Sequence, residues 1–155
     1  MHDIVKSFDA KKQTDLVILD FSKAFDTVPH KILLHKLNNY GIDGKINKWI
    51  ENILTQRQQR VIVEGEPSSS CSVESGVPQG TVLAPLLFLY RINDLPLCVR
   101  SQVRLFADDC LLYRSIKTQL NQQQLQTDLH SLERLATKCG MRFNATKCYI
   151  VSLQK

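Results

Sequence analysis

Two short, largely apolar runs joined by three residues constrain the fold of this chain more than any other feature. Val103–Phe106 and Cys110–Tyr113 flank Ala107, Asp108 and Asp109. Apolar runs of strand length with so short a connection are typical of a β-hairpin. We therefore expect a hairpin whose tip carries two adjacent carboxylates.

A third carboxylate follows another apolar run. Leu16–Leu19 is uninterrupted and is closed by Asp20, which is the pattern of a strand buried on both faces that ends in a carboxylate. If this strand lies beside the hairpin, Asp20 approaches Asp108 and Asp109. The three acids would then converge in a largely apolar setting.

Carboxylates held this close together raise one another's pKa unless a cation neutralises them. Hard divalent cations take oxygen ligands, and two of them about 4 Å apart are the usual machinery of phosphoryl transfer. The acids alone thus favour a divalent metal site at Asp20, Asp108 and Asp109. The alternative for an Asp-Asp pair is a turn-capping role without metal.

The rest of the chain mixes helices and strands. Helical spacing of apolar residues, together with Pro, Asp and Gly at the ends, predicts helices at Met1–Lys12, Pro29–Tyr40, Asp43–Gln56, Val82–Leu95 and Lys117–Cys139. In the third of these, we expect a buried stripe of Ile46, Trp49, Ile50 and Ile53. Alternation and turn residues predict strands at 60–64, 72–74 and 148–153, with a turn at 67–70. This pattern predicts one α+β domain over residues 1–155.

Composition narrows the class of protein. The 155 residues are 43% hydrophobic and 23% charged, which is ordinary for a globular protein and excludes a disordered or low-complexity chain. The formal net charge of +5 suits a phosphate-bearing partner. The densest basic patch is QRQQR at 56–60, which, with Lys45 and Lys48, could follow a nucleic-acid backbone or form a solvated face.

The cysteines and the apolar runs indicate the cellular compartment of the protein. The five cysteines are odd in number, unevenly spaced and never form C-x-x-C, which argues against a disulfide scaffold or a zinc module. Val82–Tyr90, the longest apolar run, is broken by Pro85 and is too short for a membrane span. Since no signal peptide opens the chain either, we expect an intracellular protein.

Three longer strings carry a family resemblance. LDFSKAFDTV at 19–28, SGVPQGTVLAPLLF at 75–88 and LFADDCLLY at 105–113 occur in this order and resemble the palm motifs of reverse transcriptases. The FDTV ending of the first string and the IND at 92–94 are similar to the branch of non-LTR retrotransposons, which prime on nicked target DNA. The fold implied is a polymerase palm, an α+β structure with an antiparallel sheet and helices packed on one face.

The resemblance also implies roles for the carboxylates. Asp20, Asp108 and Asp109 would bind two Mg²⁺ or Mn²⁺ ions, with the backbone carbonyl of Phe21 as an added ligand. One ion would lower the pKa of the primer 3′-hydroxyl, and the other would hold the triphosphate and the departing pyrophosphate. Lys147 stands where the family has a lysine proposed to protonate pyrophosphate; the alternative is a solvated surface lysine.

Other matching positions would contact substrate. Phe25 corresponds to a steric gate beneath the incoming sugar, where a 2′-hydroxyl would collide, and its alternative is an ordinary core aromatic. Pro78, Gln79 and Gly80 correspond to the loop that lies against the incoming nucleotide and the template. Glycine permits close backbone approach there, and glutamine offers both a donor and an acceptor. The alternative for this loop is a plain helix-entry turn.

The resemblance implies an RNA template, a DNA primer and deoxynucleoside triphosphates as partners, no membrane, and a nuclear location if the protein is expressed. The fingers and thumb of the family have no counterpart in these residues, so we expect a palm from a longer polyprotein. The alternative is a catalytically silent remnant that at most binds nucleic acid, although clustered acids would repel phosphates. A nucleotide cyclase with a similar palm is a third reading, but a cyclase would need neither the Pro78–Gly80 loop nor a gate at Phe25.

Overall fold

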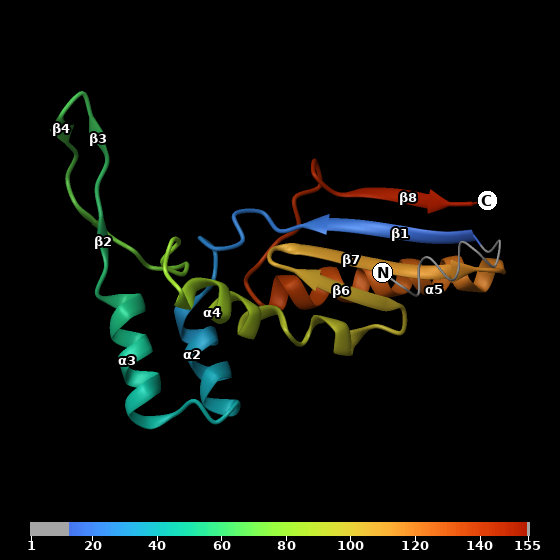
Figure 1. The fold of residues 1–155 in the computed structure, drawn as a ribbon, viewed down its shortest axis with the longest axis horizontal. Coiled ribbons are helices and arrows are strands. Elements are labelled where there is room, and N and C mark those ends of the chain that lie inside the picture. The colour runs from blue at the N-terminus through green and yellow to red at the C-terminus, as the bar shows by residue number, and fades with distance from the viewer. Residues whose placement is uncertain (1–12, 155) are drawn as a thin grey trace. The chain divides into compact units, whose positions relative to one another are not determined.

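The computed structural model describes residues 13–154, and the helix expected at 1–12 lies outside them. The chain forms two compact units (Figure 1). The described part of the first unit comprises residues 13–22 and 93–154, and the second unit comprises residues 23–92.

The first unit is built on a four-stranded antiparallel sheet. Its elements are β1 (Gln13–Asp20), the 3₁₀ helix η1 (Leu95–Cys98), β6 (Gln102–Phe106), β7 (Asp109–Ile116), α5 (Gln119–Lys138) and β8 (Tyr149–Leu153). The strand order is β6-β7-β1-β8, and every neighbouring pair is antiparallel. The predicted strand, hairpin and final strand are thus confirmed, and β1 lies at the centre beside β7.

Burial explains why β1 is central. Leu16, Val17 and Leu19 are all buried, so both faces of this strand are covered, as the uninterrupted apolar run predicted. The strand β7 contributes Cys110 and Leu112, whose side chains are fully buried. The core of the unit therefore lies around the two strands that end and begin at the predicted carboxylates.

Helix α5 covers the sheet, and contacts β7 and η1 (Figure 1). It begins at a capping box, in which the side chains of Thr118 and Asn121 bond each other's backbone amides. It ends before Gly140, whose φ of +70° is the left-handed conformation typical of a residue just beyond a helix. The arrangement agrees with the expected α+β class.

One buried carboxylate on α5 fixes the approach to β6. Asp128 accepts hydrogen bonds from the amides of Arg100 (3.2 Å) and Ser101 (2.7 Å) and from the side chain of Gln124 (2.9 Å). Burial raises the pKa of this carboxyl, but the hydrogen bonds from Ser101, Arg100 and Gln124 outweigh burial and leave the pKa below its ordinary value. Asp128 is thus a structural anion that joins helix to strand.

The second unit combines three helices with two pairs of short strands, which lie between residues 58 and 72. Its elements are α2 (His30–Asn39), α3 (Gly44–Thr55), β2 (Gln58–Gln59), β3 (Ile62–Val63), β4 (Glu66–Pro67), β5 (Cys71–Ser72) and α4 (Leu83–Ile92). Helix α2 contacts both α3 and α4. The strands pair as β2 with β5 and β3 with β4.

Two predictions for this unit were wrong. In α3 the buried residues are Ile50 and Leu54, whereas Ile46 and Trp49 are 60% and 54% exposed. The turn between β3 and β4 lies at Glu64 and Gly65, both with positive φ, and not at 67–70 as expected. Helical spacing identifies residues that share a face. The described neighbour α2 covers only part of that face of α3, so Ile46 and Trp49 stay exposed.

The helix predicted at 82–95 ends earlier, at Ile92, and a short 3₁₀ helix follows. All five cysteines lie within the described residues and carry free thiols. Burial raises the pKa of the Cys110 thiol to about 12, so this thiol is unreactive at neutral pH. Within residues 13–154, no helix is long and apolar enough to cross a membrane.

Candidate active site

The first unit brings two of the predicted carboxylates into register. Asp20 is the last residue of β1 and Asp109 is the first of β7, and the two are direct antiparallel partners. Asp108 precedes Asp109 in the turn of the hairpin, where Ala107 adopts a φ of +51°. Backbone geometry therefore delivers all three acids to one end of the sheet.

The side chains of these acids do not form a ready-made ligand set. Asp20 and Asp108 are half-buried and Asp109 is exposed. Across residues 13–154, no group of three or more His, Cys, Asp or Glu side chains is arranged to hold a metal ion. The donor chemistry still fits a hard divalent cation, because carboxylate oxygens are the ligands that such cations prefer.

Lys147 lies beside one of these acids, Asp20. Its Nζ is 3.5 Å from Oδ2 of Asp20, although its side chain is 65% exposed. The turn that carries it is organised by Asn144, whose carbonyl accepts from the Lys147 amide (2.9 Å) and whose side chain accepts from the Thr146 hydroxyl (2.7 Å). The Asn144 amide in turn donates to the carbonyl of Asp20 (2.8 Å). Lys147 is thus held next to the end of β1.

Phe21 continues β1 into a bridge with Phe143. The two rings stack with centroids 4.5 Å apart, and Phe21 is 3% exposed. The hydrogen bonds of the bridge are made by residues on either side of Phe21: the Ser22 amide donates to the carbonyl of Arg142, and the Asp20 carbonyl accepts from Asn144. The aromatic pair therefore anchors the backbone directly after Asp20.

The second unit holds the positions matched to substrate contacts. Phe25 is half-buried, and its ring stacks on that of Phe88 at 4.7 Å between centroids. Phe88 is 1% exposed. One face of the Phe25 ring is therefore tied to the core, and both interpretations of this residue, gate and core aromatic, stay open.

The Pro78–Gly80 loop enters α4. The Thr81 hydroxyl donates to the carbonyl of Pro78 (2.7 Å) and accepts from the amide of Ala84 (3.3 Å), which organises the first turn of the helix. Gln79 is exposed, and its Nε2 donates to Oδ1 of Asp26 at 2.8 Å. The loop is therefore both a helix entry and part of a polar site.

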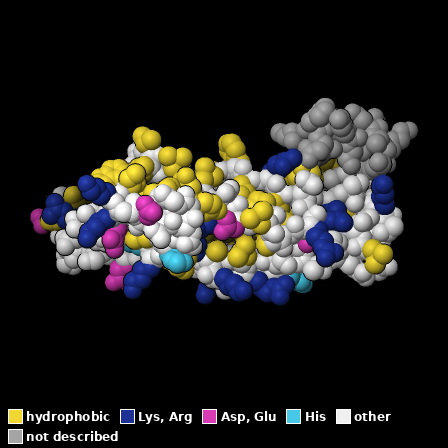
Figure 2. Space-filling view, turned by 90° about the horizontal axis from the view of Figure 1, so that it is seen from below, with side chains coloured by type: hydrophobic (Ala, Val, Ile, Leu, Met, Phe, Trp, Pro, Cys, Tyr) yellow, Lys and Arg dark blue, Asp and Glu magenta, His cyan; other side chains and the backbone are white. Residues whose placement is uncertain are grey.

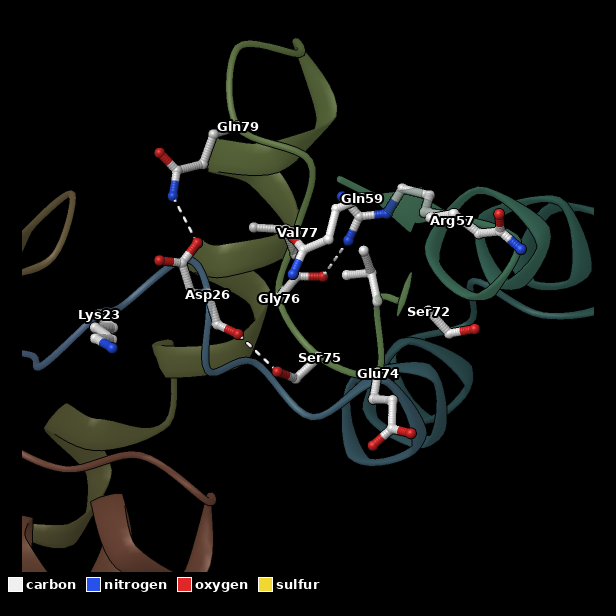
Figure 3. A pocket seen from close by; sticks show the side chains of 12 residues that line it. Lys23, Asp26, Arg57, Gln59, Ser72, Glu74, Ser75, Gly76, Val77 and Gln79 are labelled. Atoms are coloured by element: carbon white, nitrogen blue, oxygen red, sulfur yellow. Dashed lines mark hydrogen bonds between the residues drawn. The ribbon is translucent and has the colours of Figure 1, made fainter. Parts of the chain in front are cut away.

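That site is an open pocket of about 760 Å³ in the second unit (Figure 3). Its lining is polar and comes from three segments, at 23–26, 57–59 and 72–79. Sequence reasoning missed Asp26, which lines this pocket beside its hydrogen-bond partner Gln79. The signal available was its place directly after Phe25 in the FDTV string.

Arg57 has a role that the sequence did not reveal. The sequence left it either following a nucleic-acid backbone or lying on a solvated face, and in the structure its Nη2 donates to the carbonyl of Gly76 at 3.0 Å. The other basic side chains of 45–60 named above, Lys45, Lys48 and Arg60, are exposed. Basic side chains are spread over the face shown in Figure 2 and do not gather in one patch.

Comparison with known proteins identifies the family. The family model for reverse transcriptase (RNA-dependent DNA polymerase) matches residues 1–155. The chain belongs to the reverse transcriptase family. Enzymes of this family generally use divalent metal ions, in keeping with the carboxylates at the end of β1.

Curated relatives place the chain near reverse transcriptases of non-LTR elements. It is 30% identical over 161 residues to the Pol polyprotein of the type-1 retrotransposable element R2 of Popillia japonica, covering 91% of this chain and 25% of that protein. It is 28% identical over 153 residues to the RNA-directed DNA polymerase of mobile element jockey of Drosophila melanogaster, covering 93% and 17%. The chain thus spans a quarter or less of the length of these two relatives.

A solved structure supports the fold. Telomerase of Candida tropicalis, solved with a fragment of telomeric RNA, superposes with a TM-score of 0.67 over 97% of this chain and 29% of that one. The sequence identity is 14%, so this likeness shows the fold alone. It confirms the reverse transcriptase architecture expected from the three motif strings.

Proposed function

We propose that this chain is the palm of an RNA-directed DNA polymerase of a non-LTR retrotransposon and that it adds deoxynucleotides to a primer 3′-hydroxyl as part of a longer protein. The register of Asp20 with Asp109, with Asp108 in the adjoining turn, is the observation that carries the proposal. In a member of this family, three acids at one sheet end are suited to nucleotidyl transfer.

Asp20, Asp108 and Asp109 would hold two Mg²⁺ or Mn²⁺ ions, with the Phe21 carbonyl as an added ligand. When bound, such ions lower the pKa of the attacking hydroxyl and stabilise the charge of the triphosphate. The chain's own contribution is to keep Asp20 and Asp109 at adjacent strand positions and to anchor the backbone at Phe21. Lys147, already beside Asp20, would supply a proton to the departing pyrophosphate.

The second unit would supply substrate contacts. Phe25 would reject a 2′-hydroxyl, and Pro78, Gln79 and Gly80 would lie against the incoming nucleotide and the template. An RNA template, a DNA primer and deoxynucleoside triphosphates are the substrates of this proposal. The fingers and thumb would come from the rest of the polyprotein, and a nuclear location belongs to the same proposal.

Two experiments test the proposal. The first is a Mn²⁺ titration of residues 1–155, in which Asp108→Asn with Asp109→Asn should weaken binding and lower the stoichiometry. Asp43→Asn is the control, because Asp43 is exposed and its side chain makes no capping hydrogen bond within the described residues. Unchanged affinity and stoichiometry in the double variant would show that these acids do not bind the metal.

The second experiment measures RNA-templated primer extension by a chimaera. In this R2 chimaera, residues 13–154 replace the matching segment of the Popillia japonica R2 polyprotein. We expect extension that Asp109→Asn abolishes and Asp43→Asn preserves. A chimaera that is folded but inactive would favour the silent remnant instead.

Residues 1–155 alone should extend a primer poorly. Catalysis of this kind rests on positioning, and a misplacement near 1 Å can cost about a hundredfold in rate. Efficient Mg²⁺-dependent synthesis by the isolated chain would show that the palm positions its substrates without fingers or thumb.

A further inference from the structure

Within the second unit, the loop at 75–79 is fastened to the segment that follows Ala24. The amide of Gly76 donates to the carbonyl of Val28 and the amide of Val77 to that of Phe25, both at 2.8 Å. The hydroxyl of Ser75 donates to the carbonyl of Asp26 at 2.7 Å. These bonds fix the backbone beneath Gln79 relative to the backbone of Asp26.

Two further donors hold the same loop from its other side. The carbonyl of Gly76 lies 2.8 Å from Nε2 of His30. The same carbonyl accepts from Nη2 of Arg57 at 3.0 Å (Figure 3). His30 is 6% exposed, so its ring has little freedom to turn away. The loop therefore has one well-defined position, and the contacts of its side chains follow from that position.

The contact between Asp26 and Gln79 has a direction. A carboxylate accepts hydrogen bonds and cannot donate them, whereas a carboxamide has one end of each kind. The 2.8 Å contact therefore places Nε2 of Gln79 toward Asp26 and turns Oε1 away from it. Figure 3 shows this pair among the residues that line the pocket, with the amide nitrogen facing the carboxylate.

We infer that Asp26 is a positioning residue that sets the orientation of the Gln79 carboxamide, so that Oε1 is presented as an acceptor to a hydroxyl or amino group of a bound nucleotide. The identity of the ligand as a nucleotide rests on the proposed function, whereas the orientation of the Gln79 carboxamide does not. Without Asp26, the carboxamide could rotate and present Nε2 as often as Oε1. Asp26 would thus act through Gln79 without touching the nucleotide.

The orientation is tested by NMR on ¹⁵N-labelled residues 1–155, without any activity. The Nε2 protons of Gln79 are assigned by their loss in Gln79→Glu. We expect Asp26→Ala to move their resonances and to speed their exchange with water about threefold or more, since a charge-assisted hydrogen bond is lost. Asp43→Ala removes an exposed carboxylate of the same unit and should leave these resonances in place. Unchanged Gln79 resonances in Asp26→Ala would overturn the inference.

The consequence for substrate is tested in the R2 chimaera. Asp26→Ala should raise KM for deoxynucleoside triphosphates about tenfold with kcat within about twofold, because a ground-state contact is weakened. Asp26→Asn should lie between Asp26→Ala and the unsubstituted chimaera, since an asparagine can accept from Gln79 but can also rotate. A fall in kcat with KM unchanged would contradict the positioning role. An inactive unsubstituted chimaera would count against the proposed function, while the NMR result would still decide the orientation.

Discussion

The ammonium group of Lys147 lies 3.5 Å from a carboxylate oxygen of Asp20, a residue proposed to bind metal. A cation at Asp20 would therefore meet a positive charge that is already there. The lysine is largely exposed, so water and salt weaken its hold on the carboxylate. A divalent ion that binds Asp20 can therefore displace the lysine from this carboxylate.

We expect Lys147→Met to tighten Mn²⁺ binding to residues 1–155 by about two- to fivefold at low salt, because a competing charge is removed. Lys138→Met, an exposed lysine at the end of α5, should have no such effect. The measurement is a Mn²⁺ titration at two salt concentrations, and the difference between the variants should shrink at the higher one. Weaker binding in Lys147→Met would mean that the lysine supports the metal site.

Phe25 is expected to discriminate between sugars. In the R2 chimaera, Phe25→Val should lower the preference for deoxynucleotides over ribonucleotides by about tenfold, since space opens where a 2′-hydroxyl would collide. Phe25→Tyr keeps the ring and should retain the preference. Both nucleotide classes are measured by kcat/KM. An unchanged ratio in Phe25→Val would assign Phe25 to the core through its stacking on Phe88.

Gly76 should tolerate no side chain. A Cβ there would lie 2.8 Å from backbone atoms of Phe25 and Asp26, and its φ is +86°. We expect Gly76→Ala to lower the free energy of unfolding by about 3 kcal/mol, from backbone strain and forced displacement. Gly80→Ala is the matched control, with a φ of +81° and no described atom within 4 Å of a Cβ. Its cost should be about 1 kcal/mol, and equal losses in the two denaturation curves would show that the close packing is unimportant.

Asp128 should make stability depend on acid. Its folded-state pKa is below the ordinary value, so the unfolded chain binds the proton more readily, and stability falls as pH drops from about 4 through the lower folded pKa. Asp128→Asn should lower the free energy of unfolding by about 1–3 kcal/mol at neutral pH and flatten this acid dependence. Glu133→Gln, an exposed change on the same helix, should do neither. Parallel pH profiles of wild type and Asp128→Asn would contradict this account.

The elements around the acids were predictable because their signals are local. A continuous apolar run closed by Asp20 and a hairpin tip at Asp108 are both readable within a few residues. The exposed Ile46 and Trp49 were not predictable, since helical spacing shows which residues share a face but not whether a partner covers it. Asp26 was missed because its contact with Gln79 joins positions 53 residues apart. Likewise, nothing near Arg57 in the sequence points to the carbonyl of Gly76.

Asn144 ties the segment after α5 to the end of β1 through the carbonyl of Asp20, while its own turn carries Lys147. The distance between Asp20 and Lys147 is therefore set by the short segment that Asn144 bonds to β1. The number of residues between Gly140 and Lys147 should stay constant in descendants of this sequence, because an inserted or deleted residue would move Lys147 away from the end of β1. Substitutions that preserve length should accumulate there far more readily than insertions or deletions.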